Sequence, residues 1–232
     1  MFRTGTAIVG LALGLTLASC TPEDAGVEGT VRPNAAGLVP LPCDGSEPMD
    51  PAHPAYCSRG RVYVRPQVRA ALIDAAREMA ERFPGTRLIF MDASGADGRV
   101  PFEPHLSHGD GRQVDISLFY VSLDGDQIQG TPPSSRLNGY GNYEPPRPGD
   151  PQPCRGIDRP NDDRDPPADR AWRLDDERSR ALTEILSANS AVRRILIEPH
   201  LERRWHLESD PKLRFAGCQA ARHDDHLHVD FN

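Results

Sequence analysis

The sequence HLHVDF, residues 226–231, alternates strictly between polar and apolar side chains. Since successive side chains of a β-strand point to opposite faces, this period of two predicts a strand with one face in the core. The opposite face carries His226, His228 and Asp230. Two imidazoles that alternate in this way on one strand face are well placed to bind a metal ion. The segment therefore predicts a core strand and half of a functional site.

A second histidine-containing segment precedes another alternating strand, predicted at 113–119. His105 and His108 come before the turn Gly-Asp-Gly at 109–111, whose glycines allow the chain to reverse direction. Asp115 is expected on the face of the strand opposite to its apolar side chains. If this strand pairs with the closing one, His108, Asp115 and His228 become neighbours.

One Zn²⁺ ion is predicted to bind His108, Asp115 and His228. Two imidazole nitrogens and a carboxylate oxygen suit this borderline-soft ion, and three protein ligands leave a fourth position open, as in catalytic sites. A metal there lowers the pKa of water and polarises a carbonyl group. His226, on the same face as His228, is placed to act as a general base or to stabilise a tetrahedral intermediate. The alternative is that these histidines are ordinary surface residues.

The N-terminal residues are typical of an export signal. Arg3 precedes an apolar stretch, 7–17, that is too short to span a bilayer. The sequence LASC that ends at Cys20 resembles the bacterial lipoprotein box, in which the cysteine is lipidated and becomes the mature N-terminus. We expect a signal peptide at 1–19 and a flexible tether at 20–40 that starts with the lipidated cysteine. An ordinary secretory signal, cleaved near the same position, is the alternative.

The expected location is the periplasm of a Gram-negative bacterium. By the same resemblance to lipoproteins, Thr21 in place of an aspartate favours the outer membrane over retention in the inner membrane. The lipid anchor is then the only contact with the membrane. A net charge of −7 argues against a nucleic-acid partner, because phosphates favour a basic surface.

Composition and length predict one domain with much irregular structure. The chain has 232 residues, of which 38% are hydrophobic and 23 are prolines. We place the domain at 41–232 and, inside it, a loop insertion at 124–171 that is rich in proline, glycine and aspartate. The sequence NGYGNY within this loop carries Tyr140, Asn142 and Tyr143, which either line a substrate groove or belong to an ordinary surface loop.

Apart from the lipidated Cys20, the chain has four cysteines, an even number that in an exported chain predicts disulfide bonds. Several pairings are possible. We favour Cys43–Cys57, which are close in sequence, and Cys154–Cys218, which would tie the loop insertion to the segment before the last histidines. Free buried thiols are the alternative, and the spacing excludes a zinc site built from CxxC motifs.

Hydrophobic periodicity predicts the remaining elements. Apolar residues at spacings of three to four predict a helix from Pro66 to Phe83, ended by Pro84-Gly85. A second helix is predicted after Leu174, with Asp175 or Asp176 as its cap. Short apolar or alternating segments predict strands at 61–64, 87–91, 113–119, 192–197 and 226–231. This mixed order predicts an α+β domain.

Two motifs carry a resemblance to a known family. His-x2-His-x6-Asp at 105–115, followed by His-x2-His-x-His at 223–228, resembles the penicillin-insensitive murein endopeptidases. These belong to a wider group of zinc peptidases that share the fold of lysostaphin, D-Ala-D-Ala peptidases and hedgehog domains. The resemblance spans about residues 61–231, and it implies a small central antiparallel sheet with flanking helices.

The resemblance also implies roles for individual residues. His108, Asp115 and His228 correspond to zinc ligands, and His226 to the catalytic histidine. His223 corresponds to an auxiliary catalytic residue, whereas His105 lies close to the metal or is a further ligand.

The implied reaction is cleavage of peptide bonds in the stem peptides of peptidoglycan, typically cross-links between D-Ala and diaminopimelate. One alternative is a D,D- or L,D-carboxypeptidase of the same fold. Another is a non-catalytic lipoprotein that binds zinc or the cell wall.

Overall fold

A computed structural model describes residues 1, 31–100, 102–103, 105, 107–132, 138–159 and 169–232. The chain divides into two units, Met1–Val31 and Arg32–Asn232, and the second contains all the helices and strands below. The predicted lipidation site, Cys20, and the predicted signal peptide beyond Met1 lie outside the described residues. Within the described ranges, no helix is long and apolar enough to cross a membrane.

A six-stranded sheet forms the centre of the folded unit, which is of the α+β class. Its strands, in spatial order, are β2 (Met49–Pro51), β4 (Leu88–Phe90), β5 (Gln113–Ser117), β10 (His226–Phe231), β8 (Val192–Leu196) and β9 (Leu213–Arg214). The pairings β4–β5, β5–β10 and β10–β8 are antiparallel, whereas β2–β4 and β8–β9 are parallel. The expectation of an antiparallel sheet therefore holds for its middle, and the two edge strands make the sheet mixed.

Two short ribbons accompany this sheet. β1 (Val39–Pro40) pairs with β3 (Tyr63–Val64), and β6 (Tyr120–Ser122) pairs with β7 (Trp172–Leu174). β1 lies in the segment that we expected to be tether, and the folded unit starts at Arg32. Val39 is buried in the core, so the folded unit includes residues before the predicted boundary at Leu41.

Helices form where the apolar periodicity predicts them. α2 (Pro66–Arg82) has a proline in its first turn, where no backbone N–H is needed. α3 (Asp176–Ala188) is capped by Asp175, whose side chain accepts a hydrogen bond from Arg178 N at 3.1 Å. Two short helices, α1 (Ala55–Ser58) and α4 (Pro199–Arg204), were not predicted.

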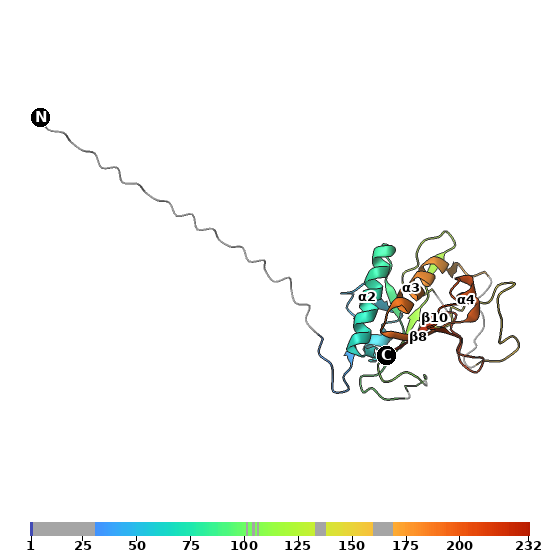
Figure 1. The fold of residues 1–232 in the computed structure, drawn as a ribbon, viewed down its shortest axis with the longest axis horizontal. Coiled ribbons are helices and arrows are strands. Elements are labelled where there is room, and N and C mark those ends of the chain that lie inside the picture. The colour runs from blue at the N-terminus through green and yellow to red at the C-terminus, as the bar shows by residue number, and fades with distance from the viewer. Residues whose placement is uncertain (2–30, 101, 104, 106, 133–137, 160–168) are drawn as a thin grey trace. The chain divides into compact units, whose positions relative to one another are not determined.

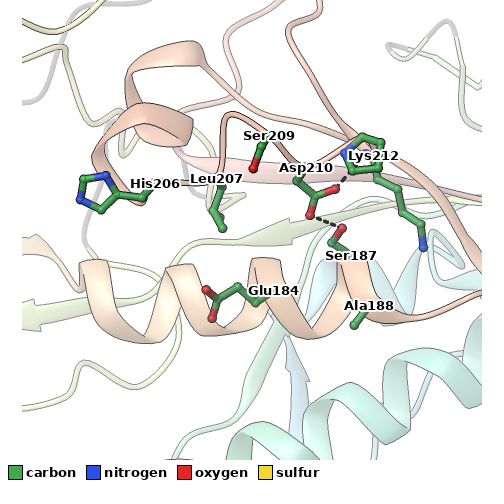
Figure 2. A pocket seen from close by; sticks show the side chains of 9 residues that line it. Glu184, Ser187, Ala188, His206, Leu207, Ser209, Asp210 and Lys212 are labelled. Atoms are coloured by element: carbon green, nitrogen blue, oxygen red, sulfur yellow. Dashed lines mark hydrogen bonds between the residues drawn. The ribbon is translucent and has the colours of Figure 1, made fainter.

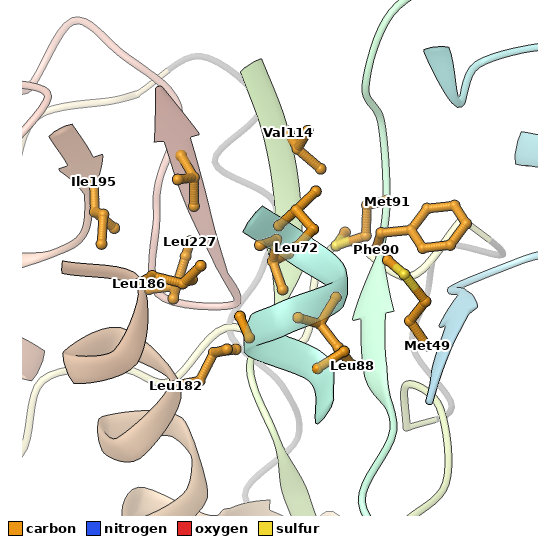
Figure 3. Packing of buried hydrophobic residues seen from close by; sticks show 14 of the residues in the cluster. Met49, Leu72, Leu88, Phe90, Met91, Val114, Leu182, Leu186, Ile195 and Leu227 are labelled. Carbon is orange, nitrogen blue, oxygen red and sulfur yellow. The ribbon is translucent and has the colours of Figure 1, made fainter. Parts of the chain in front are cut away.

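The core lies between the sheet and the two long helices. α2 and α3 are in contact with each other, and α3 also contacts β8 (Figure 1). Figure 3 shows Leu72 of α2 and Leu186 of α3 packed near Leu227 of β10. All three side chains are fully buried. Because strand side chains alternate, the helices cover the apolar face of β5 and β10, and the polar side chains of both strands lie on the other face.

Both predicted disulfide bonds are present. Cys43 is bonded to Cys57 in α1, and Cys154 in the loop insertion is bonded to Cys218. The second bond joins two segments that are 64 residues apart in sequence and that both lie outside helices and strands. It constrains the chain just before β10, where the histidine-rich segment begins.

A candidate metal centre on the polar face of the sheet

The pairing of β10 with β5 sets His228 directly opposite Asp115. Side chains of directly paired residues project from the same face of a sheet and contact each other. Nδ1 of His228 lies 2.9 Å from Oδ1 of Asp115. Two residues that are 113 positions apart in sequence are thus joined by the register of one strand pair.

His108 completes this group from the turn that precedes β5. Its Nε2 lies 3.1 Å from His228 Nδ1 and 3.3 Å from Asp115 Oδ1. Its other nitrogen, Nδ1, lies 2.7 Å from the carbonyl oxygen of Ala93. A carbonyl only accepts, so Nδ1 carries the proton and the Nε2 lone pair faces the group. Metal-binding histidines are commonly oriented by such a bond.

Glycines make the turn that holds His108 possible. Gly109 and Gly111 have φ angles of 135° and 81°, in the left-handed region that favours glycine. A Cβ atom on Gly109 would lie 2.0 Å from the carbonyl oxygen of Arg99. Both glycines donate their backbone N–H to the buried hydroxyl oxygen of Ser94, which secures the turn. The predicted role of the Gly-Asp-Gly turn is therefore realised in the fold.

The three donor atoms fit one tetrahedral metal ion. Zinc ligands near 2.0–2.1 Å from the ion are separated from one another by about 3.3 Å in a tetrahedron. The distances among His108 Nε2, Asp115 Oδ1 and His228 Nδ1 are 2.9, 3.1 and 3.3 Å. Burial would raise the pKa of Asp115, but His108 and His226 hold it well below its ordinary value. The carboxylate is therefore ionised, as a ligand must be.

His105 lies at the edge of this group. Ligand atoms of His105, His108 and Asp115 are all within 4.8 Å of one another, so these three residues could hold a metal ion. Nδ1 of His105 is 3.8 Å from Asp115 Oδ2, and its Nε2 is 2.9 Å from Asp92 Oδ2. The set that contains His228 is the more compact of the two. His105 is better described as a neighbour that Asp92 orients toward the centre.

His226 points its Nε2 at the same centre. That atom is 3.9 Å from Asp115 Oδ1. On the other side of the ring, Nδ1 lies 2.5 Å from Oδ1 of Asp225, which is buried and also accepts a hydrogen bond from Gly141 N at 2.6 Å. Burial would lower the pKa of His226, but the carboxylate of Asp225 raises it above its ordinary value. The aspartate thus fixes both the ring orientation and the tautomer.

His223 lies beside the other two histidines of its motif. Its ring centroid is 5.0 Å from that of His226 and 5.9 Å from that of His228. Its buried Nδ1 has no hydrogen-bond partner among the described residues. Burial, together with the two neighbouring imidazoles, holds the pKa of His223 well below its ordinary value. The ring is therefore neutral and lies next to the centre without being part of the donor set.

Two residues of this site, Asp92 and Asp225, were not predicted from the sequence, and neither was the contact that Tyr140 makes. Asp225 immediately precedes β10, and the side-chain direction of a residue before a strand does not follow from the alternation of the strand. Tyr140 lies in the loop insertion, and its hydroxyl donates a hydrogen bond of 2.5 Å to Asp115 Oδ2. The sequence NGYGNY left open whether Tyr140 lines a groove or belongs to a surface loop, and it did not indicate this contact.

The centre opens into a cleft of about 1140 Å³. Its walls include His105, Asp115, His223, His226 and His228, so every catalytic or metal residue predicted from the motifs borders it except the fully buried His108. The cleft is thus able to bring a substrate to the donor atoms.

A second hollow, of about 430 Å³, lies between α3 and the segment 206–212 (Figure 2). On its wall the Ser187 hydroxyl bonds to Asp210, and Lys212 Nζ donates to the Asn189 carbonyl oxygen at 2.7 Å. None of the predicted site residues lines this hollow, so the large cleft is the candidate functional site.

Comparison with known proteins adds no relative. No family model matches the chain, and no curated protein sequence matches it. The geometry of the centre and the two sequence motifs are therefore the features that point to a function.

Proposed function

We propose that the protein is a zinc-dependent peptidase that cleaves peptide bonds in peptidoglycan, in particular cross-links between D-Ala and diaminopimelate. The observation that carries the proposal is the compact group of His108, Asp115 and His228, whose donor atoms are 2.9–3.3 Å apart at the wall of a large cleft. Three protein donors leave one tetrahedral position open, which is the pattern of catalytic zinc sites.

His226 is the residue that moves protons in this proposal. A bound Zn²⁺ supplies Lewis-acid polarisation of the peptide carbonyl and activates water at neutral pH. His226 Nε2, 3.9 Å from Asp115 Oδ1, faces the position where the carbonyl would react. Asp225 keeps the proton on Nδ1 and stabilises the charge that the ring acquires when it takes up a second proton. His223 lies beside it as a neutral neighbour.

The polar pairs in the cleft favour an endopeptidase over a carboxypeptidase. A carboxypeptidase needs a cation to bind the terminal carboxylate of its substrate. Of the arginines that line the cleft, Arg61 is bonded to Asp92, and Arg222 donates to both oxygens of Asp224 at 3.0 and 2.6 Å. The third, Arg59, is exposed. Two of these three cations are thus committed to ion pairs, which leaves the exposed Arg59 as the only arginine among the described lining residues that is available to bind a chain end.

The pairing of His226 with Asp225 favours an enzyme over a silent binding module. A structural zinc site needs four ligands and no oriented base. Here an additional histidine faces the centre with its tautomer set by a buried carboxylate. This arrangement has no function in simply holding an ion. A closed site with His105 as fourth ligand is the arrangement that would suit a scaffold.

Metal analysis combined with muropeptide digestion tests the proposal. Purified wild type is expected to contain about one zinc per chain and to release monomeric muropeptides from cross-linked sacculi. Asp115→Ala is expected to lose both properties. Asp124→Ala, which removes an exposed carboxylate, serves as the matched control and keeps both. Zinc-loaded wild type that leaves cross-links intact refutes the endopeptidase, and release of single terminal residues identifies a carboxypeptidase.

The location forms a separate part of the proposal. Lipidation of Cys20 would anchor the domain at the periplasmic side of the outer membrane, within reach of the wall. The two disulfide bonds fit an oxidising compartment. Incorporation of radiolabelled lipid into wild type, and its loss in Cys20→Ala, is the expected result. Equal labelling of both proteins contradicts the anchor.

A further inference from the structure

Tyr140 belongs to the loop insertion, yet its side chain is almost completely buried beside the metal centre. Its hydroxyl donates to Oδ2 of Asp115 at 2.5 Å. A phenol hydroxyl carries a proton that it can donate, and a carboxylate oxygen accepts. The ionised carboxylate has no proton to give. Tyr140 is therefore the donor of this hydrogen bond, and Asp115 is the acceptor.

The two oxygens of Asp115 therefore have different partners. Oδ1 lies 2.9 Å from His228 Nδ1 and 3.3 Å from His108 Nε2, and so belongs to the donor group. Oδ2 accepts the hydrogen bond from Tyr140. The terminal torsion of an aspartate is broad, so the strand alone does not determine which oxygen faces the ion. The tyrosine hydroxyl supplies the missing restraint.

The loop that carries Tyr140 is itself held to the site. The next residue, Gly141, donates its N–H to Oδ2 of Asp225, the carboxylate that orients His226. Farther along, Glu144 N donates to the carbonyl oxygen of Asp224 at 3.0 Å. The consecutive residues Tyr140 and Gly141 thus restrain two carboxylates. Tyr140 restrains Asp115 in the donor group, and Gly141 restrains Asp225, which orients His226.

We propose that Tyr140 is a positioning residue of the metal centre, which occupies Oδ2 of Asp115 and leaves Oδ1 as the single oxygen presented to the ion. This inference rests on the proposed zinc site. Residues that orient metal ligands through hydrogen bonds typically contribute about 10–100-fold to metal affinity. The loop insertion therefore contributes to the metal centre by orienting a ligand, although none of the three proposed ligands belongs to it.

Zinc affinity measured by competition with a chelator tests the inference. Tyr140→Phe keeps the ring and removes the hydroxyl, and it is expected to bind zinc about 10–100-fold more weakly than wild type. Tyr56→Phe is the matched control, because its hydroxyl donates to the Asn138 carbonyl oxygen at 2.8 Å in the same loop and touches no ligand. The control is expected to keep the wild-type affinity.

Each outcome decides between named explanations. Equal affinity of Tyr140→Phe and wild type overturns the inference. Equal losses in Tyr140→Phe and Tyr56→Phe overturn it as well, because they assign the effect to loop order. Wild type that binds no zinc overturns the inference together with the proposed zinc site, whereas zinc-loaded wild type that leaves cross-links intact overturns the proposed function alone.

Two spectroscopic measurements complement the affinities. With Co²⁺ in place of zinc, the visible absorption spectrum is expected to change in Tyr140→Phe and to stay unchanged in Tyr56→Phe, because it reports ligand geometry. In zinc-loaded wild type, proton NMR is expected to show a slowly exchanging, downfield hydroxyl resonance coupled to the ring of Tyr140. Absence of this resonance contradicts the inference even if the variant does not fold.

Discussion

His228 and Asp115 face each other across the antiparallel ladder between β10 and β5, with 2.9 Å between Nδ1 and Oδ1. The register of this ladder is set by the apolar residues on the opposite face, since a shift by one residue would expose Leu227 and Val229. The same hydrophobic pattern that forms the core therefore brings two of the proposed ligands together. A metal ion is not needed to assemble them.

Metal removal is accordingly expected to leave the fold intact. Chelated protein should keep its far-ultraviolet circular dichroism and unfold cooperatively at a lower temperature. With zinc at about 1000 times its dissociation constant, the stabilisation is about 4 kcal/mol, and for a domain of this size each kcal/mol corresponds to about 2–4 °C. A chelated protein that is unfolded at 25 °C would contradict a centre built by the sheet.

Separation of metal binding from catalysis is expected at His226. His226→Ala should retain zinc and lose about 10²–10⁴-fold in kcat, the range typical of a lost proton-transfer group. Asp225→Asn should also retain zinc and lower kcat, because an amide does not stabilise the charged ring. Zinc content and kcat are measured on the same preparations. Loss of zinc in either variant would show that these residues hold the metal and do not act on the substrate.

The elements with strong periodicity could be predicted from the sequence. α2 and α3 follow the predicted ranges, and Asp175 caps α3 as expected. The small elements α1, α4, β1, β2, β6, β7 and β9 were missed. The strands among them have only two or three residues and the two helices fewer than two turns, so none of them shows a repeating pattern. β1 is recognisable only by its pairing with β3, which a local pattern does not reveal.

The site could be predicted only as far as strand alternation reaches. The faces of Asp115, His226 and His228 follow from a period of two, and the pairing of their strands brings them together. Asp92, Asp225 and Tyr140 act through single contacts made by residues outside any repeating pattern. Such contacts depend on tertiary structure alone.

Glu144 is expected to stabilise the loop insertion in a pH-dependent way. This buried carboxylate bonds to Arg170, Arg204 and Arg147 at 2.6, 2.9 and 3.1 Å. Glu144→Gln should lower the free energy of unfolding by about 3 kcal/mol at pH 7, as for other broken buried pairs. Glu184→Gln, which breaks an exposed pair with Arg180, should change it by less than about 0.5 kcal/mol.

The sign of the pH dependence follows from the pKa. Burial would raise the pKa of Glu144, but the hydrogen bond from Arg170 lowers it below its ordinary value of 4.5. Its stabilisation is therefore fully present above pH 4.5 and is lost as the pH falls through the folded-state pKa. Denaturant unfolding of both proteins between pH 7 and pH 3 should show the difference between them shrinking toward acid. A constant difference would contradict the ionic origin.

Gly109 offers a test of how the turn places His108. Gly109→Ala forces a side chain into a φ of 135° and also sets its Cβ 2.0 Å from the Arg99 carbonyl oxygen. Gly125→Ala has a comparable φ of 94° with nothing within 4 Å of the added atom, so it measures conformational strain alone. Strain of this kind costs about 1–3 kcal/mol. We expect Gly125→Ala to lose that much stability and no zinc affinity, and Gly109→Ala to lose more stability together with zinc affinity, because the turn must shift. Equal unfolding free energies and equal zinc affinities in the two variants would show that the close approach to Arg99 does not position the ligand.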